Sequence, residues 1–182
     1  MHLAEGFLAT LAVREDAITQ DALLDLATAL QKRFIDRQHG VMMEKPLGAV
    51  DNWFEPGHQF EWFFLLDSSE VLRGTPLHAS LTRAFAYAEL KGVDKLSGAV
   101  SGMLALDGSV RDGTQRIWAQ AEYLRALTLR PGSEAVLQRQ LLALQQNFLH
   151  EKGWHECLDA KGAVSRRDMP STTPYHLSLI HI

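Results

Sequence analysis

The sequence predicts an all-α fold made of stacked helix hairpins. Apolar residues recur every three or four positions in six segments, and this period places one apolar stripe along each segment if it is helical. Segments rich in glycine and proline separate the helices into pairs. The six expected helices cover residues 2–14, 21–36, 58–73, 76–91, 114–129 and 133–149.

The first hairpin is expected to end in a long loop. Asp21 is expected to cap or favour the start of the second helix, because an acidic side chain stabilises a helix N-terminus. Residues 40–57 contain several glycines and prolines, which a helix interior does not tolerate. The next helix is therefore expected to start at His58.

The second and third hairpins carry clear boundary signals. Pro76 suits the first turn of a helix, where its missing N–H costs nothing. Pro131 and Gly132 separate the last two helices. The glycine-rich stretch 98–113 is expected to form a hairpin or loop insertion between the second and third pairs.

The hairpins repeat at a regular interval. The interval from His2 to His58 and from His58 to Thr114 is the same, 56 residues, and a fourth unit is expected near Thr173. A regular period is typical of repeat architectures, in which each unit buries its apolar face against its neighbours. Because the array begins and ends inside helices, we expect this chain to be part of a longer array.

The repeat also carries chemistry. His2 and Glu5, and likewise His58 and Glu61, are three residues apart at the start of consecutive units. Such residues share a helix face, so the carboxylate can orient the imidazole. A single pair of this kind is usually a solvated surface feature, but repetition in register favours a site. We expect His2, His58, the region of Trp118 and His176 to meet where the first helices begin.

Composition limits the classes of partner. The chain has 182 residues, 46% of them hydrophobic and 22% charged, which fits one globular domain. A net charge of −4 gives no general attraction to nucleic acid or to an anionic membrane, and no apolar run could span a bilayer. The only cysteine, Cys157, favours a reducing cytoplasm. Zinc-ligand spacing and nucleotide-binding glycine motifs are absent, so we expect neither a metal nor a cofactor.

Four segments, in order, resemble motifs of the N-acylglucosamine 2-epimerase superfamily. This superfamily includes mannose isomerases and cellobiose 2-epimerases. The Glu-Pro-Gly-His-Gln-Phe-Glu-Trp block is the most specific of the four, and the resemblance covers almost the whole chain up to Leu177. The four segments are Met1–Glu5, Glu55–Trp62, Arg116–Glu122 and Thr173–His176.

The resemblance implies an (α/α)6 barrel, of which this chain holds about three hairpins. Residues 1–177 would form the C-terminal part of one catalytic domain, and residues 178–182 would be a non-native or truncated tail. A part of a barrel is expected to be inactive by itself. The full-length protein is a possible homodimer.

The resemblance also implies roles for individual side chains. His58 and His176 would be the acid and base, with Glu61 orienting or tuning His58. Histidine suits both tasks because its pKa lies near neutral pH. The sugar substrate, in its open-chain form, would be bound by His2, Glu5, Trp118 and Glu122.

The expected reaction is aldose–ketose isomerisation of mannose or a related sugar through an enediol. The closest alternative is 2-epimerisation of N-acylglucosamine or cellobiose by the same two histidines. A non-catalytic helical-repeat binding module is a further alternative. An α-barrel glycoside hydrolase would instead require two carboxylates about 5–10 Å apart across a cleft.

Overall fold

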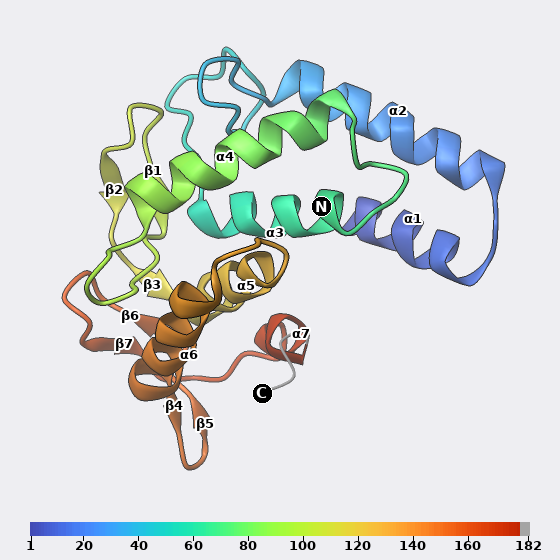
Figure 1. Cartoon of the computed structure of the whole chain (residues 1–182). Helices are drawn as coiled ribbons and strands as arrows, with labels where there is room; N and C mark the ends of the chain where they lie inside the picture. The colour runs from blue at the N-terminus through green and yellow to red at the C-terminus, as the bar shows by residue number, and fades with distance from the viewer. Residues whose placement is uncertain (179–182) are drawn as a thin grey trace.

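The computed structural model describes residues 1–178 as three helix hairpins followed by a short seventh helix (Figure 1). The three predicted hairpins are confirmed. The proposed tail, residues 178–182, lies almost entirely outside the described residues. The helices are α1 (His2–Val13), α2 (Ala17–Arg33), α3 (Pro56–Asp67), α4 (Pro76–Gly92), α5 (Ile117–Thr128), α6 (Glu134–Phe148) and α7 (Thr173–Ser178).

Local chemistry sets several boundaries differently from the prediction. Asp16, not Asp21, caps α2, because its side chain accepts the N–H groups of Ile18 and Thr19. Helix α3 begins two residues before His58, at Pro56, and residues beyond Asp67 form turns rather than helix. Pro76 does lie in the first turn of α4, as predicted.

The chain is rich in helix, as the all-α prediction requires, but it also contains short strands. Short antiparallel strands occupy the link between α4 and α5 and the segment after α6. In the glycine-rich link, the first two strands form the expected hairpin. The strands after α6 were not predicted, because strands of two or three residues carry too few positions to display an alternating pattern. The strands are β1 (Met103–Leu104), β2 (Val110–Asp112), β3 (Gln115–Arg116), β4 (Leu149–His150), β5 (Gly153–Trp154), β6 (Cys157–Leu158) and β7 (Val164–Arg166).

Helix α3 is the centre of the fold. It packs against both α4 and α5, and its apolar residues surround the helix rather than forming one stripe, which is typical of a fully buried helix. Gly57 permits the close approach of α5: a Cβ atom there would lie 2.7 Å from the Trp118 ring and 2.8 Å from the Ala119 Cβ atom. The start of α3 is thereby pressed against the start of α5.

The first helices of successive units begin at His2, Pro56, Ile117 and Thr173. The repeat is therefore real in its order, but its register is looser than the interval of 56 residues in the sequence suggests. The β1–β2 hairpin and strand β3 lie between the second and third units, and they displace the start of α5.

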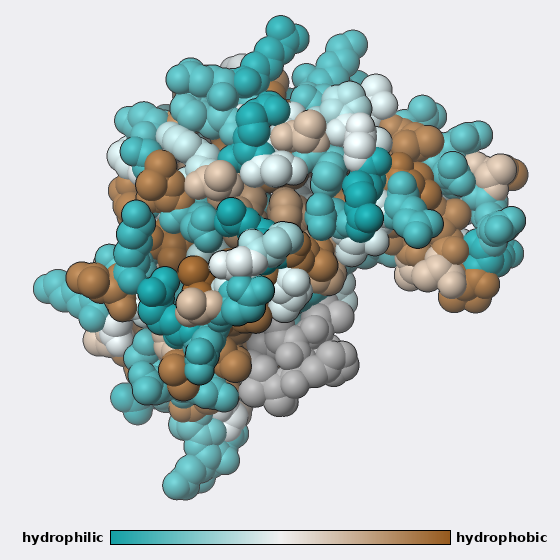
Figure 2. All heavy atoms as spheres, viewed as in Figure 1, coloured by the Kyte–Doolittle hydropathy of each residue, from teal (hydrophilic) through white to brown (hydrophobic). Residues whose placement is uncertain are grey.

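Helices α1 and α2 project from the rest of the molecule and carry exposed apolar side chains (Figures 1 and 2). Leu3 is 58% exposed, Val13 87% and Ile18 83%. Within residues 1–178, each helix is too short or too polar to cross a bilayer.

Candidate functional site

Four aromatic ring contacts connect the starts of the first helices of the units. From α3 to α5, the ring centroids of His58 and Trp118 are 5.0 Å apart, and from α5 to α7 those of Trp118 and His176 are 5.4 Å apart. Tyr175 then lies 5.2 Å from His176 and 6.0 Å from His2 on α1. The predicted meeting of His2, His58, Trp118 and His176 is therefore confirmed as geometry.

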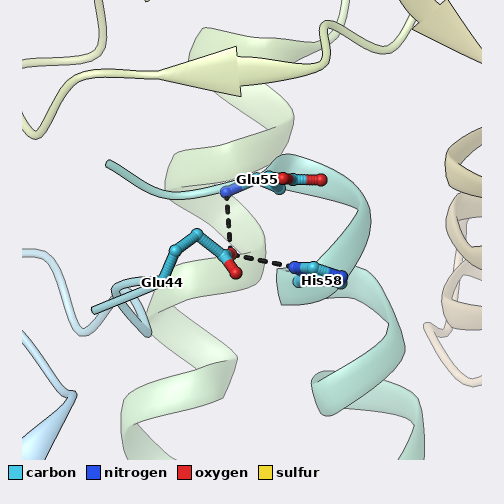
Figure 3. A group of neighbouring side chains, drawn as sticks. All are labelled: Glu44, Glu55 and His58. Atoms are coloured by element: carbon cyan, nitrogen blue, oxygen red, sulfur yellow. Dashed lines mark hydrogen bonds and ion pairs between the residues drawn. The ribbon is translucent and has the colours of Figure 1, made fainter. Parts of the chain in front are cut away.

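His58 has a carboxylate partner, but this partner is Glu44 rather than Glu61. The Nδ1 atom of His58 lies 2.9 Å from Oε1 of Glu44, which comes from the loop between α2 and α3 (Figure 3). Burial alone would lower the pKa of His58. The hydrogen bond to Glu44 and the negative charges of Glu44, Glu55 and Glu61 outweigh burial, so the pKa is raised. Glu61 thus acts on His58 through charge, not through a hydrogen bond.

His176 is held by Glu122 of α5. Its Nδ1 atom lies 2.8 Å from Oε1 of Glu122, a carboxylate that is fully buried. The Nη1 atom of Arg125, one turn further along α5, donates to both oxygens of Glu122 at 3.1 and 2.9 Å. Arg125 therefore compensates the buried charge of Glu122, while Glu122 orients the imidazole.

Glu61 is the unusual carboxyl group of the site. It is 2% exposed, and its Oε1 atom has no hydrogen-bond partner among the described residues. Burial and the nearby charge of Glu122 raise its pKa to about 7, against the opposing influence of His176 and His58. Near neutral pH, a substantial fraction of Glu61 is therefore protonated and able to donate a hydrogen bond.

The predicted pairing of His2 with Glu5 is confirmed, at 2.9 Å between Nδ1 and Oε2. The other oxygen of Glu5 accepts the hydroxyl of Tyr175 on α7. Burial alone would raise the pKa of Glu5, but the hydrogen bonds from Tyr175 and His2 lower it. Glu5 therefore joins the first helix of the chain to the last.

A cavity of about 520 Å³ opens beside Trp118 and His176, a volume within the usual range for small-molecule sites. Arg116, Glu156 and Thr173 also line it. Its wall therefore offers hydrogen-bond donors and acceptors of both charges next to an aromatic ring, which suits a hydroxyl-rich molecule.

Within residues 1–178, two groups of side chains could hold a metal ion. In one, the ligand atoms of Glu44, Glu55 and His58 lie within 4.8 Å of one another, and in the other those of Glu61, Glu122 and His176 do. Each group contains an imidazole nitrogen that already has a carboxylate partner. The expectation that the chemistry needs neither metal nor cofactor stays a prediction.

Sequence reasoning missed Glu44 and Arg125, and it did not assign a role to Tyr175. Glu44 is 14 residues from His58, so no helical spacing connects them, and Tyr175 had only its motif as a signal. A carboxylate partner does not by itself distinguish the site, because His78 also pairs with Asp67 at 3.0 Å. What distinguishes the site is that two carboxylate-bound imidazoles flank one tryptophan.

Fold and site together define a class: an array of helix hairpins whose helix starts bring two carboxylate-bound histidines to an aromatic ring. A sequence model of the N-acylglucosamine 2-epimerase (GlcNAc 2-epimerase) family matches residues 1–179, so the chain belongs to that family. A "Mannose-6-phosphate isomerase" of Rhizobium meliloti (strain 1021) is 33% identical over 199 residues, covering 97% of this chain and 51% of the relative.

Two solved structures share the fold. A D-mannose isomerase superposes with a TM-score of 0.75 at 22% identity, over 97% of this chain and 50% of that structure. A cellobiose 2-epimerase from Bacillus thermoamylovorans B4167 superposes with a TM-score of 0.78 at 18% identity, over 99% of this chain and 51% of that structure. The chain thus spans about half the length of the relatives it matches.

Proposed function

We propose that this chain carries the acid/base residues of a sugar isomerase that interconverts mannose, or a related free sugar, and its ketose. The observation that carries the proposal is the arrangement of His58 and His176 on either side of Trp118, each with Nδ1 bound to a carboxylate. In each ring Nε2 is the nitrogen left to exchange a proton with a substrate.

The chemistry requires one proton to move between two carbons. A base removes the proton from C2 of the open-chain aldose, and the electrons of that C–H bond form the C1–C2 double bond while the carbonyl oxygen takes up a proton. The enediol then loses the proton of its C2 hydroxyl, and C1 is protonated to give the ketose. One histidine acts as the base and the other supports proton transfer at oxygen.

Glu61 supports this mechanism as a hydrogen-bond donor. Its raised pKa, about 7, keeps a neutral carboxyl group available beside two histidines. A neutral carboxyl group can donate a hydrogen bond to the negative charge that develops on the sugar oxygen in the transition state. An ionised carboxylate has no proton to donate. His2, Glu5 and Trp118 are proposed to bind the sugar hydroxyls and ring face. Glu122 was also expected to bind the sugar, but its side chain is fully buried and bound by Arg125 and His176, so we propose that it acts through His176.

The charges around the histidines favour an uncharged sugar. Glu44, Glu55, Glu61 and Glu122 are all within reach of the two imidazoles, and Arg125 is already bound to Glu122. A phosphate dianion beside the two imidazoles would meet these carboxylates, whereas Arg116 lines the neighbouring cavity and acts on Glu55. We therefore propose mannose rather than mannose 6-phosphate as substrate, although one relative is described as an isomerase of the phosphorylated sugar.

The alternative is 2-epimerisation, in which the proton returns to the opposite face of C2. The similarity in fold to a cellobiose 2-epimerase keeps this alternative open. It would use both histidines at the same carbon, which the flanking arrangement around Trp118 also permits. A non-catalytic repeat module has no need for such an arrangement, and family membership disfavours it.

We further propose that residues 1–177 form the C-terminal part of an (α/α)6 barrel, and that the complete protein can dimerise. The shared fold and the half-length coverage of the relatives support a barrel completed by further helices. The three hairpins of the described residues account for half of the six that such a barrel needs.

The function is tested by incubating the protein, extended to the length of its relatives, with mannose, mannose 6-phosphate, cellobiose and N-acetylmannosamine in deuterated water. An isomerase converts mannose to its ketose and incorporates deuterium at C1. A 2-epimerase inverts C2 and incorporates deuterium there. Turnover of mannose 6-phosphate in preference to mannose contradicts the proposed substrate, and failure to convert mannose to its ketose contradicts the proposed reaction.

A further inference from the structure

The loop that carries Glu44 is fixed to helix α3 by the residue next to His58. Gln59 is fully buried, and its side-chain amide binds the backbone of Met42 in both directions: it donates to the carbonyl oxygen at 2.9 Å and accepts the N–H at 2.8 Å. The Glu44 N–H donates to the carbonyl oxygen of Trp53 at 2.9 Å. The backbone of Glu44 therefore has a set position relative to α3.

The side chain of Glu44 also has a set position. Its Oε1 atom accepts the backbone N–H of Glu55 at 3.3 Å, and the same atom contacts Nδ1 of His58 at 2.9 Å (Figure 3). Glu55 is the residue immediately before α3, and its N–H has no partner within the helix. Two donors from the start of one helix therefore converge on a single carboxylate oxygen.

We propose that Glu44 is a positioning residue for His58. Its carboxylate accepts a hydrogen bond from the protonated Nδ1, and this leaves Nε2 as the nitrogen that exchanges a proton with the sugar. A histidine ring has two nitrogens, and the hydrogen bond made by one decides which tautomer the other presents. The proposal rests on the proposed function, because it assigns Glu44 to the histidine taken as acid or base there.

The surroundings of His58 make Glu44 the main source of this control. The charged groups that act on the imidazole are Glu44 from the loop, Glu55 immediately before α3, and Glu61 within α3. On the opposite side, α5 contributes the uncharged ring of Trp118. Arg116, just before α5, acts on Glu55. Among the residues that the structure describes, only Glu44 combines a charge with a hydrogen bond to the ring.

The direct test is a titration of the histidine ring protons by NMR in the 182-residue chain. In Glu44→Gln, we expect the pKa of His58 to fall, because burial is then less strongly opposed. The Glu44→Asp variant keeps the charge and should retain more of the raised pKa, which also guards against a folding defect specific to Gln. An unchanged His58 titration in Glu44→Gln overturns the proposal.

A matched control lies at the other end of the same helix. Asp67, the last residue of α3, also pairs with a histidine, His78, but it contacts Nε2 of that ring, whereas Glu44 contacts Nδ1 of His58. Asp67→Asn should leave the titration of His58 unchanged. If Asp67→Asn shifts the pKa of His58 as much as Glu44→Gln does, removal of any nearby carboxylate has this effect, and the specific role of Glu44 is rejected.

Kinetics separate this proposal from the proposed function. In the active, extended protein, Glu44→Gln should lower kcat about 10- to 100-fold with little change in KM, less than the loss from removing an acid/base group itself. In the pH profile of kcat, the limb that reports the ionisation of His58 should move to lower pH. If His58→Asn retains activity, the proposed function fails, whereas the Glu44–His58 coupling is still judged by NMR. If kcat falls but neither the pH profile nor the NMR titration of His58 shifts, positioning of His58 by Glu44 is refuted.

Discussion

The carboxylate of Glu122 lies 2.8 Å from Nδ1 of His176 and is simultaneously bound by Arg125. Glu122 is fully buried, and its two partners come from different helices, α5 and α7. This arrangement couples the stability of the buried core to the orientation of an imidazole in the proposed active site.

Replacing Arg125 with Met should therefore be strongly destabilising. It leaves the buried Glu122 charge without its guanidinium partner, a change that typically costs about 3–5 kcal/mol. Urea denaturation monitored by circular dichroism measures the loss. Arg130→Met is the matched control, because the Arg130–Glu89 pair is substantially exposed, at 39% and 30%, and should contribute about 0–1 kcal/mol. Equal losses in the two variants would show that Glu122 does not depend on Arg125.

Replacing His58 with Asn in the active, extended protein should abolish exchange of the sugar C2 proton. The expected loss is about 10²- to 10⁴-fold in kcat, with KM nearly unchanged, because a general acid/base acts in the transition state. Phe60→Leu is the contrast: Phe60 is fully buried against Phe85 and Tyr123, so it should alter stability before chemistry. Retention of more than about a tenth of the wild-type turnover by His58→Asn contradicts its acid/base role.

Glu61 should make the fold less stable as pH rises from about 4.5 to about 7. Its pKa is raised to about 7 in the folded chain from 4.5, so between these values the folded state binds more protons than the unfolded state. Glu61→Gln should remove this dependence, a difference on the order of 3 kcal/mol at the upper end of the window. Denaturant midpoints measured across this pH range provide the test. The exposed Glu70→Gln variant should follow the wild-type pH dependence.

Gly57→Ala should disturb the contact between α3 and α5. The added Cβ would lie 2.7 Å from the Trp118 ring, so a helix or the indole must shift, at a cost of about 1–3 kcal/mol. Denaturation and tryptophan fluorescence report the two effects. Gly6→Ala in α1 is the control, because a Cβ there meets nothing within 4 Å. It should stabilise the helix by about 0.5–1 kcal/mol. A neutral Gly57→Ala substitution would mean that the two helix starts are not held in close contact.

The 182-residue chain by itself should be inactive towards the sugars named above. The exposed apolar side chains of α1 and α2, including Leu3, Val13 and Ile18, are expected to be covered by further helices in the proposed barrel. Joining the chain to the N-terminal half of a relative should restore turnover and reduce binding of a hydrophobic dye. Full activity of the 182-residue chain contradicts the partial-barrel proposal.

The sequence alone predicts the three hairpins, because helical periodicity and Pro/Gly boundaries are local properties of the chain. It also predicts that His2, His58, Trp118 and His176 meet, because the repeat places each of them near the start of a first helix. The boundary signals were less reliable: Asp16 and Asp21 are both suitable caps, and only the folded backbone selects Asp16.

The tertiary structure decides which carboxylate serves which imidazole. His-x-x-Glu spacing predicts the pair correctly for His2 and Glu5, but His58 binds Glu44 across 14 residues of chain. Glu61 is left buried, and one of its oxygens has no hydrogen-bond partner within residues 1–178. Helical spacing states only which residues share a face. The actual partner depends on how a loop is folded back and held, here by Gln59, and on which carboxyl group burial leaves protonated.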